Sequence, residues 1–170
     1  MKPTRLLKFS LMLGLTFTLS TASGLAAAAV QVQFVTPEKY RDAVPDVWHG
    51  QARETDPTLK ELRKHIEKSA ARYFAADRTL RVMVLDLDLA GEIKHLGSTM
   101  REVRVLNQIS WPVIKLRYEI EKDGRIETQG EETLSDPNYQ DHVNRYSNSD
   151  ALRHERRMLD EWLDRKFSGH

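Results

Sequence analysis

The alternation of apolar and charged positions is clearest in the second half of the chain, where it predicts a β-hairpin. From Ile114 to Ile120 every second residue is apolar, and the residues between them are charged. This period of two is typical of a strand with one buried face. Residues 126–134 form the returning strand. A three-residue loop that ends at Gly124 would set Ile120 opposite Ile126, so the parity of the apolar positions favours it over a two-residue loop.

Three other segments have the pattern of strands, namely residues 30–35, 80–89 and 101–109. Residues 91–100 are predicted to be a loop, and Pro112 should separate the third of these strands from the hairpin because proline interrupts a strand. Strict alternation in residues 80–89 predicts two faces. One face carries Met83, Leu85, Leu87 and Leu89, and the other carries Val82, Val84, Asp86 and Asp88.

Two helices are predicted from apolar residues at helical spacing. The first begins at Asp56-Pro57, a capping residue followed by a proline at the first helical position, and runs to about Ala76. The second is capped by Ser149 or Asp150 and runs to about Phe167. Residues 36–55 have no clear period and are predicted to be an irregular loop. The sequence therefore predicts an α+β fold, a mostly antiparallel sheet of about five strands with two helices packed on one face.

The first 29 residues have the order of a secretory signal peptide. Lys2, Arg5 and Lys8 form a positive start, the segment Phe9–Leu19 is mostly apolar, and Ala26–Ala29 offers an A-x-A cleavage pattern. A membrane span needs about 20 consecutive apolar residues, and this apolar segment is shorter and contains polar residues. We expect cleavage near Ala29, a single mature domain over residues 30–170, and a periplasmic location, or secretion where there is no outer membrane. An uncleaved anchor is the alternative.

Composition and charge exclude several classes of function. The chain has 170 residues and no cysteine, so it has neither disulfides nor a thiolate nucleophile. The leader carries three of the 26 basic residues and none of the 25 acidic ones, which leaves 23 against 25 and a net charge of −2. This balance does not favour nucleic-acid binding. No G-x-G, Walker A or G-x-S-x-G motif is present, and we expect no cofactor.

Six segments, taken together, carry a resemblance to a known family. They are Phe34–Tyr40, Val84–Gly91, Val103–Val105, Trp111–Pro112, Leu134–Tyr139 and Glu155–Trp162. As a set they resemble the domain of unknown function 3016, which occurs in exported bacterial proteins and has no assigned activity. The resemblance implies export and a single domain, and it implies no chemistry. An aromatic residue often stands in that family at the position of His154, which argues against a ligand role for this histidine.

Two partial motifs resemble metal sites. His154-Glu155 begins like the zinc motif H-E-x-x-H, but the fifth position is Met158. Asp86 and Asp88 begin like a calcium-binding loop, but the position of its bidentate glutamate is occupied by Gly97. We therefore predict no metal site. The remaining histidines, which show no ligand spacing, are interpreted as surface residues: His49, His65, His95 and His170.

Four carboxylates stand on or beside predicted apolar faces, namely Asp86, Asp88, Glu132 and Glu155. In the predicted hairpin register, Glu132 shares a face with Leu134 and Ile126. Buried carboxylates are usually paired, and Arg104 and Arg117 are available partners. The alternative is a catalytic carboxylate pair for glycan cleavage, which requires two acids on either side of the bond.

Two segments are candidates for binding. Lys60, Lys64, Lys68 and Arg72 recur every four residues on the first predicted helix and form a basic stripe. A stripe of this kind is either an ordinary solvated face or a docking face for an anionic envelope component, such as a phospholipid or lipopolysaccharide head group. Residues 138–149 form either a binding loop or a structured connector, and the candidates there are Tyr139, Arg145 and Tyr146.

Because no complete catalytic motif is present, the sequence favours a non-catalytic envelope protein that binds or helps to assemble a component of the periplasm. The alternative is a small carboxylate-dependent hydrolase that acts on cell-wall glycan. A pocket that joins two of the four carboxylates would favour the enzyme, whereas carboxylates paired with arginine would favour the binding protein.

Overall fold

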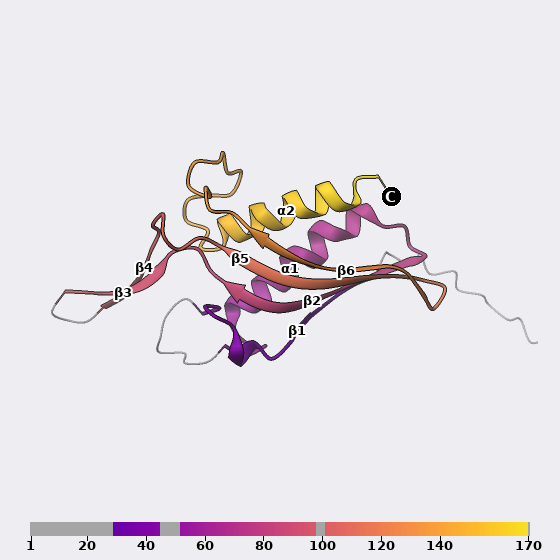
Figure 1. The fold of residues 1–170 in the computed structure, drawn as a ribbon, viewed down its shortest axis with the longest axis horizontal. Helices are drawn as coiled ribbons and strands as arrows, with labels where there is room; N and C mark the ends of the chain where they lie inside the picture. Colours follow the sequence, from indigo (N-terminus) through magenta and orange to yellow (C-terminus); the bar gives the residue numbers. More distant parts are fainter. Residues whose placement is uncertain (1–28, 45–51, 98–100, 170) are drawn as a thin grey trace, which may run out of the picture.

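Two helices cover one face of a four-stranded sheet in the computed structural model, which describes residues 29–44, 52–97 and 101–169 (Figure 1). The strand order in this sheet is β1-β2-β5-β6, and β3 and β4 pair as a separate two-stranded sheet. The predicted α+β class is therefore confirmed. The strands are β1 (Ala29–Phe34), β2 (Arg78–Asp88), β3 (Glu92–Leu96), β4 (Arg101–Val105), β5 (Val113–Lys122) and β6 (Arg125–Ser135), and the helices are α1 (Pro57–Ala70) and α2 (Arg153–Phe167).

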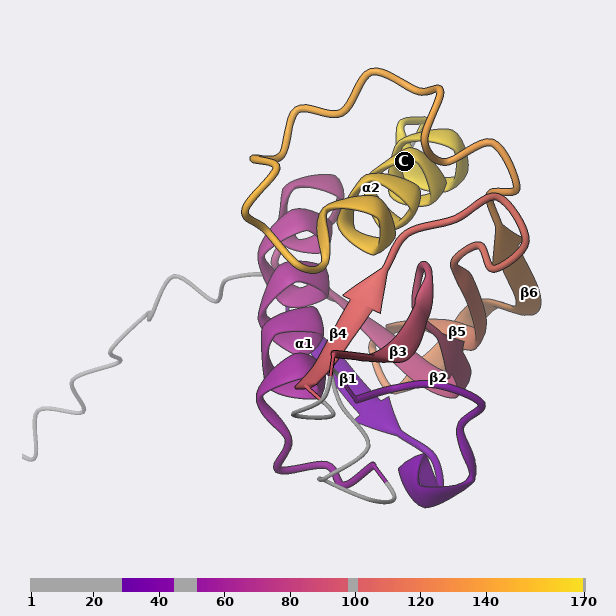
Figure 2. The same cartoon turned by 90° about the vertical axis from the view of Figure 1, so that its left-hand side faces the viewer.

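The chain enters the sheet by a parallel pair and leaves it by a hairpin. β1 runs parallel to β2, and α1 connects them, as parallel neighbours require. β2 pairs antiparallel with β5, and β5 pairs antiparallel with β6. Within the described ranges, two short 3-10 helices, η1 (Pro37–Lys39) and η3 (Ala71–Tyr73), follow β1 and α1. Figure 2 shows α1 and α2 side by side over the sheet.

The core lies between the helices and the sheet. α1 contributes Leu59, Leu62 and Ile66, all fully buried, and α2 contributes Leu159, Trp162 and Leu163. Each such side chain stabilises the fold by about 1.5–3 kcal/mol relative to exposure. Tyr118 of β5 packs edge-on against Trp162, with ring centroids 6.0 Å apart. Gly130 lies opposite Tyr118, and a Cβ atom there would come within 2.6 Å of the tyrosine hydroxyl, so glycine makes room for this ring.

The predicted hairpin exists, but its predicted register is wrong by two residues. The loop contains only Asp123 and Gly124, whose positive φ angles of 50° and 75° are those of a type I′ turn. Ile120 pairs with Thr128 because a bulge follows the turn. Ile126 consequently lies opposite Glu121 and is exposed, so it does not share the face of Glu132.

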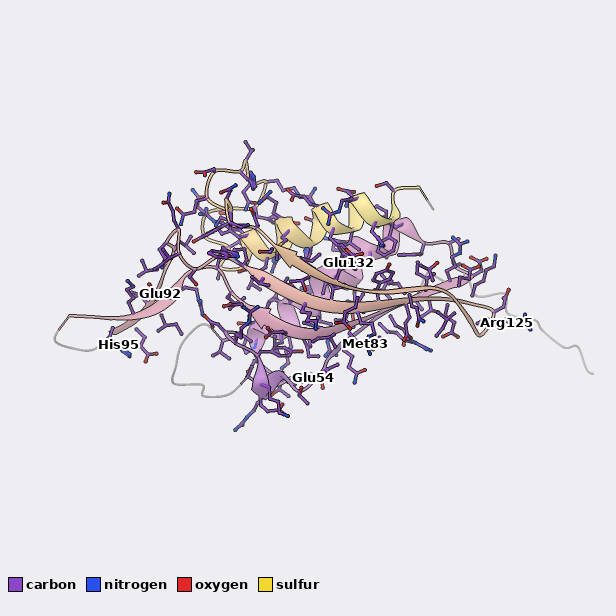
Figure 3. All side chains as sticks on the ribbon, in the orientation of Figure 1. Glu54, Met83, Glu92, His95, Arg125 and Glu132 are labelled. Atoms are coloured by element: carbon purple, nitrogen blue, oxygen red, sulfur yellow. The ribbon has the colours of Figure 1, made fainter. Side chains whose placement is uncertain are left out.

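A second bulge, in β2, makes the two faces of this strand differ from the predicted ones. The register shifts between Val84 and Asp86, so Leu85 is the extra residue. Val84 and Leu87 are both fully buried as a result, whereas Asp86 and Asp88 lie on the face away from the helices. The prediction that these aspartates share a face with Val82 and Val84 is therefore wrong. Figure 3 shows Met83 on this outer side and Glu132 on the helix side.

Several predicted boundaries also differ. Residues 92–96 form strand β3 rather than a loop, and β4 ends at Val105 instead of residue 109. α1 ends at Ala70, where η3 replaces it, and α2 begins at Arg153. Asp150 still acts near the start of α2, because its carboxylate accepts a hydrogen bond from the backbone N–H of Leu152 at 2.9 Å. The predicted leader lies almost entirely outside the described residues. Among the helices within the described ranges, none is long and apolar enough to cross a membrane.

Candidate anion-binding groove

A groove of about 610 Å³ runs between α1 and the segment that leads into α2. It brings together the two sets of binding candidates that lie in separate segments of the sequence. One wall carries Lys64, Lys68 and Arg72 of the basic stripe. The opposite wall carries Arg145 and Tyr146 of residues 138–149, the connector. Lys60 is exposed on α1 but does not line the groove. The lining residues are Glu61, Lys64, His65, Lys68, Ser69, Arg72, Arg145, Tyr146 and Arg156.

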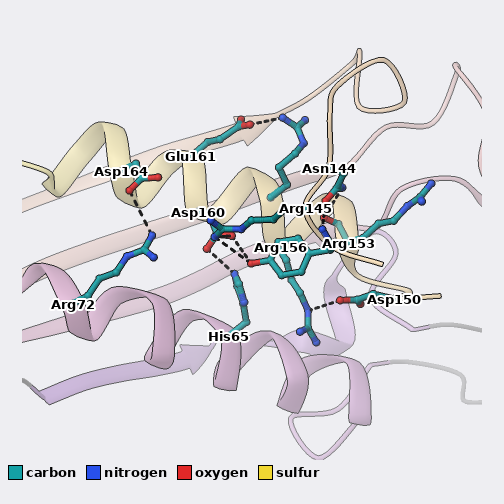
Figure 4. A network of polar contacts seen from close by, with 12 residues as sticks. His65, Arg72, Asn144, Arg145, Asp150, Arg153, Arg156, Asp160, Glu161 and Asp164 are labelled. Atoms are coloured by element: carbon teal, nitrogen blue, oxygen red, sulfur yellow. Dashed lines mark hydrogen bonds and ion pairs between the residues drawn. The ribbon is translucent and has the colours of Figure 1, made fainter. Parts of the chain in front are cut away.

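A ladder of polar contacts joins α1 and η3 to α2 beneath this groove, and Figure 4 draws two of its contacts, His65–Asp160 and Arg72–Asp164. Glu61 pairs with Arg156 at 3.1 Å, and His65 lies 3.1 Å from Asp160. Four residues further along α2, Asp164 lies 3.5 Å from Arg72. Residues four apart lie on the same face of a helix, so the two helices meet here along polar edges. These contacts fix how far α1, one wall of the groove, lies from α2 and the connector, which form the other wall.

Asp160 is the centre of this ladder. Its side chain is 5 % exposed. Oδ1 lies 3.1 Å from Nε2 of His65, while Oδ2 accepts hydrogen bonds from the Tyr146 hydroxyl and from Nη2 of Arg145. Burial alone would raise the pKa of Asp160, but the contacts with His65, Tyr146 and Arg145 outweigh it and hold this pKa far below its usual range. Asp160 is therefore ionised and keeps Arg145 and Tyr146 in place.

The positive charge of the groove comes mainly from Lys64 and Lys68. Both are exposed, they are one helical turn apart, and neither has an acidic partner among the described residues. Each groove arginine, by contrast, contacts a carboxylate: Arg72 contacts Asp164, Arg145 contacts Asp160, and Arg156 contacts Glu61 and Asp150.

Tyr139, the third candidate of the connector, does not join the groove. It is completely buried, and its hydroxyl donates a hydrogen bond to the carbonyl of Asn107 at 2.7 Å. Its ring packs edge-on against His154, with centroids 4.6 Å apart. A role for Tyr139 as a surface contact is therefore wrong, because this tyrosine anchors the connector to the core.

Each of the four candidate carboxylates is held by a contact with another part of the chain. Asp86 and Asp88 both bind Arg41 on the outer face, at 2.6 and 3.1 Å. Burial raises the pKa of Asp88. Glu132 binds Lys166 at 2.8 Å and accepts a hydrogen bond from the indole N–H of Trp162 at 3.1 Å.

Glu155 is fully buried and has no ion pair among the described residues. Its Oε1 accepts a hydrogen bond from the backbone N–H of Ala90 at 2.8 Å, and burial raises its pKa. The predicted partners bind elsewhere, because Arg104 pairs with Asp42 at 2.7 Å and Arg117 with Glu131 at 2.9 Å. The prediction of arginine pairs is thus correct for Asp86 and Asp88 and wrong for Glu132 and Glu155.

The sequence missed His65 and Asp160. The prediction that His65 is a surface residue is wrong, because His65 is buried. The side chain of His95, by contrast, is about half exposed. His49 and His170 lie outside the described residues. The position of His65 beside Ile66 on the apolar edge of α1 is a signal that could have marked it as buried. Within the described ranges, no three His, Asp or Glu side chains are placed to hold a metal ion.

Comparison with known proteins places the chain in a family. No curated protein matches it. A crystal structure of an uncharacterized protein is 12 % identical and aligns over 85 % of this chain and 80 % of its own, with a TM-score of 0.34. Protein XCC0632 from Xanthomonas campestris, of family DUF330, is 14 % identical over 87 % and 88 % of the two chains, with a TM-score of 0.38. The family described as "Protein of unknown function (DUF3016)" matches residues 28–165, and the chain therefore belongs to the DUF3016 family.

Proposed function

We propose that this protein is an exported, non-catalytic accessory of the cell envelope that binds an anionic component through the groove between α1 and the connector. The observation that carries the proposal is the position of Lys64 and Lys68. These two lysines, which have no acidic partner in the described part of the chain, line the same hollow as Arg145 and Tyr146. Excess positive charge in a concave site attracts anions.

The proposed location rests on the leader. Its positive start, apolar segment and alanine run are those of an exported protein, and the mature domain would begin at the first strand. In the periplasm the groove would meet anionic lipid head groups. In a bacterium with no outer membrane the protein would be secreted.

The positions of the carboxylates support binding over glycan hydrolysis. A hydrolase of that kind needs two acids that flank one bond, about 5–10 Å apart. Asp86 and Asp88 share one arginine on the outer face, whereas Glu132 and Glu155 lie on the helix side, each with its own partner. Each carboxylate has a structural role in this arrangement.

Sedimentation with lipid vesicles tests the proposal. Mature protein, residues 30–170, should bind vesicles that contain phosphatidylglycerol at low salt and should not bind vesicles of phosphatidylcholine. Binding should weaken strongly at high salt, because the screening length falls from about 10 Å at 0.1 M to about 3 Å at 1 M. The variant Lys64→Glu with Lys68→Glu should lose binding.

The matched control is Lys39→Glu with Lys94→Glu, which makes the same change in net charge at exposed sites that do not line the groove. Surface lysines contribute little to stability, so both variants should fold. Equal loss of binding in the two variants would show that net charge, and not the groove, is responsible. A wild-type protein that ignores anionic vesicles at low salt would refute the proposed function.

A further inference from the structure

The two walls of the groove carry cations of different kinds. On the α1 wall, Lys64 and Lys68 are flexible point charges about 6 Å apart along the helix axis. Side chains of this length can both reach a single anionic group between them. Since neither has an acidic partner among the described residues, the uncompensated charge on this wall is two.

On the opposite wall, Arg145 is held in a fixed orientation. The contacts of its guanidinium with Asp160 and with the Tyr146 hydroxyl all use Nη2. The guanidinium also lies over the Tyr146 ring, 5.4 Å from its centroid. Its side chain is 57 % exposed, and Nε and Nη1 remain for another acceptor. Nε and Nη1 lie on different edges of the guanidinium, so each can donate one further charge-assisted hydrogen bond to an oxyanion in the groove.

We propose that the ligand group of this groove is a phosphomonoester, which Lys64 and Lys68 contact from one wall and Arg145 from the other. The inference rests on the proposed function and names the chemistry that the site recognises. A phosphomonoester carries a charge of about −1.5 to −2 and three terminal oxygens. A carboxylate or a phosphodiester carries a single charge and two free oxygens, so it matches the two lysines and the guanidinium less fully.

The size of the groove agrees with such a ligand. Sites for small molecules have volumes of about 300–1,000 Å³, and this groove has about 610 Å³. A phosphate group between the walls leaves space for the glycerol or sugar that carries it. Asp160 does not face the ligand directly in this arrangement. It is a positioning residue, because it holds the Nη2 edge of Arg145.

The test compares two vesicle types at equal surface charge, matched by zeta potential. Phosphatidic acid presents a phosphomonoester, and phosphatidylglycerol presents a phosphodiester. Wild-type protein should bind phosphatidic acid roughly tenfold more tightly, the difference expected from one further charge-assisted hydrogen bond. Soluble glycerol 3-phosphate is added as a competitor. Competition would identify the free phosphomonoester as sufficient, whereas a preference without competition would identify the lipid-borne group as the ligand.

The decisive variant is Arg145→Lys, which keeps the charge but removes the planar guanidinium that Asp160 and Tyr146 orient. It should bind phosphatidylglycerol as before and lose the preference for phosphatidic acid. Arg125→Lys, at the distant hairpin turn, is the matched control and should keep the preference (Figure 3). Asp160→Asn should resemble Arg145→Lys if Asp160 positions the guanidinium.

The outcomes separate this inference from the proposed function. Equal binding of the two lipids by wild-type protein would overturn the phosphomonoester alone. A preference that survives Arg145→Lys would also overturn it. Absence of binding to both anionic lipids at low salt would overturn the proposed function and this inference together.

Discussion

Nε2 of His65 on α1 lies 3.1 Å from Oδ1 of Asp160 on α2, and both side chains are almost completely buried. The pair lies at the polar seam where the two helices meet, directly under the groove. Because Asp160 also accepts hydrogen bonds from Arg145 and Tyr146, one carboxylate connects α1, α2 and the connector. The buried contacts of Asp160 therefore hold the two walls of the groove in position.

Removal of this carboxylate should destabilise the protein. Asp160→Ala leaves Tyr146 and Arg145 without their common acceptor and removes the buried charged neighbour of His65, and breaking a buried charged contact of this kind costs about 3 kcal/mol or more. Urea denaturation at pH 7 measures the free energy of unfolding. In a double-mutant cycle with His65→Gln, the coupling should be about 1–3 kcal/mol, as for residues in direct contact. Strictly additive effects would show that the two residues do not interact.

The same carboxylate should give a distinct pH dependence. Its folded pKa is lowered, so it contributes stability above its unfolded pKa, near 4, and that contribution is lost as the pH falls below this value. Asp160→Asn should therefore lose less stability than wild type between pH 5 and pH 3. Parallel urea curves at these two pH values measure the difference, and an identical loss in the two proteins would contradict the assignment.

The sequence predicted the class of the fold because apolar periodicity depends on local geometry. The strands at 30–35, 80–89 and 114–134 and both helices are recovered from that pattern alone. The bulge after the turn at Asp123 could not be predicted, because an extra residue in the turn and one in the strand restore the same parity. The bulge at Leu85 inserts one residue with no compensating change, so it puts Asp86 and Asp88 on the opposite face from Val82 and Val84.

The site was predicted in part. The basic residues Lys64 and Lys68 and the connector residues Arg145 and Tyr146 were all identified, each in its own segment. Their meeting depends on how α1 and α2 align, and residues such as His65 and Asp160 are 95 positions apart in the chain. A periodic pattern within one helix contains no information about that alignment.

Variants of Glu155 measure how much the ionisation of a buried carboxyl group lowers the free energy of unfolding. Its pKa is raised by burial, so ionisation opposes folding, and its stability contribution falls as the pH rises above its unfolded pKa near 4.3. Glu155→Gln keeps an acceptor for the N–H of Ala90 and cannot ionise. It should equal wild type at pH 4 and be at least as stable at pH 7.

Glu155→Ala, in contrast, leaves the buried N–H of Ala90 without its acceptor and should cost about 1–3 kcal/mol at both pH values. Unfolding in urea distinguishes the two variants. If the glutamine variant is as unstable as the alanine variant at pH 7, a cation must compensate the charge of Glu155.

The mature N-terminus is the next prediction. Export and cleavage should give a chain that begins at Ala29, Val30 or nearby, since the run Ala26–Ala29 supplies the A-x-A cleavage pattern. Mass spectrometry of protein recovered from the periplasm measures this directly. Exported protein that still begins at Met1 would instead be the uncleaved, anchored form.

His154 should make the fold sensitive to mild acid. Burial, reinforced by the positive charges of Arg153 and Arg157, lowers the pKa of His154 from 6.5 to about 4. The unfolded chain therefore binds a proton between pH 6.5 and pH 4 that the folded protein does not bind, and stability falls over this window by about 2–3 kcal/mol. His154→Phe keeps a ring against Tyr139 and removes the titrating group, so its urea midpoint should change less between pH 7 and pH 4.5. His154→Gln, a polar variant that does not titrate, is the control that separates the loss of the proton site from the gain of apolar packing. An imidazole NMR titration with a midpoint near 6.5 in the folded protein would contradict the buried, neutral state of His154.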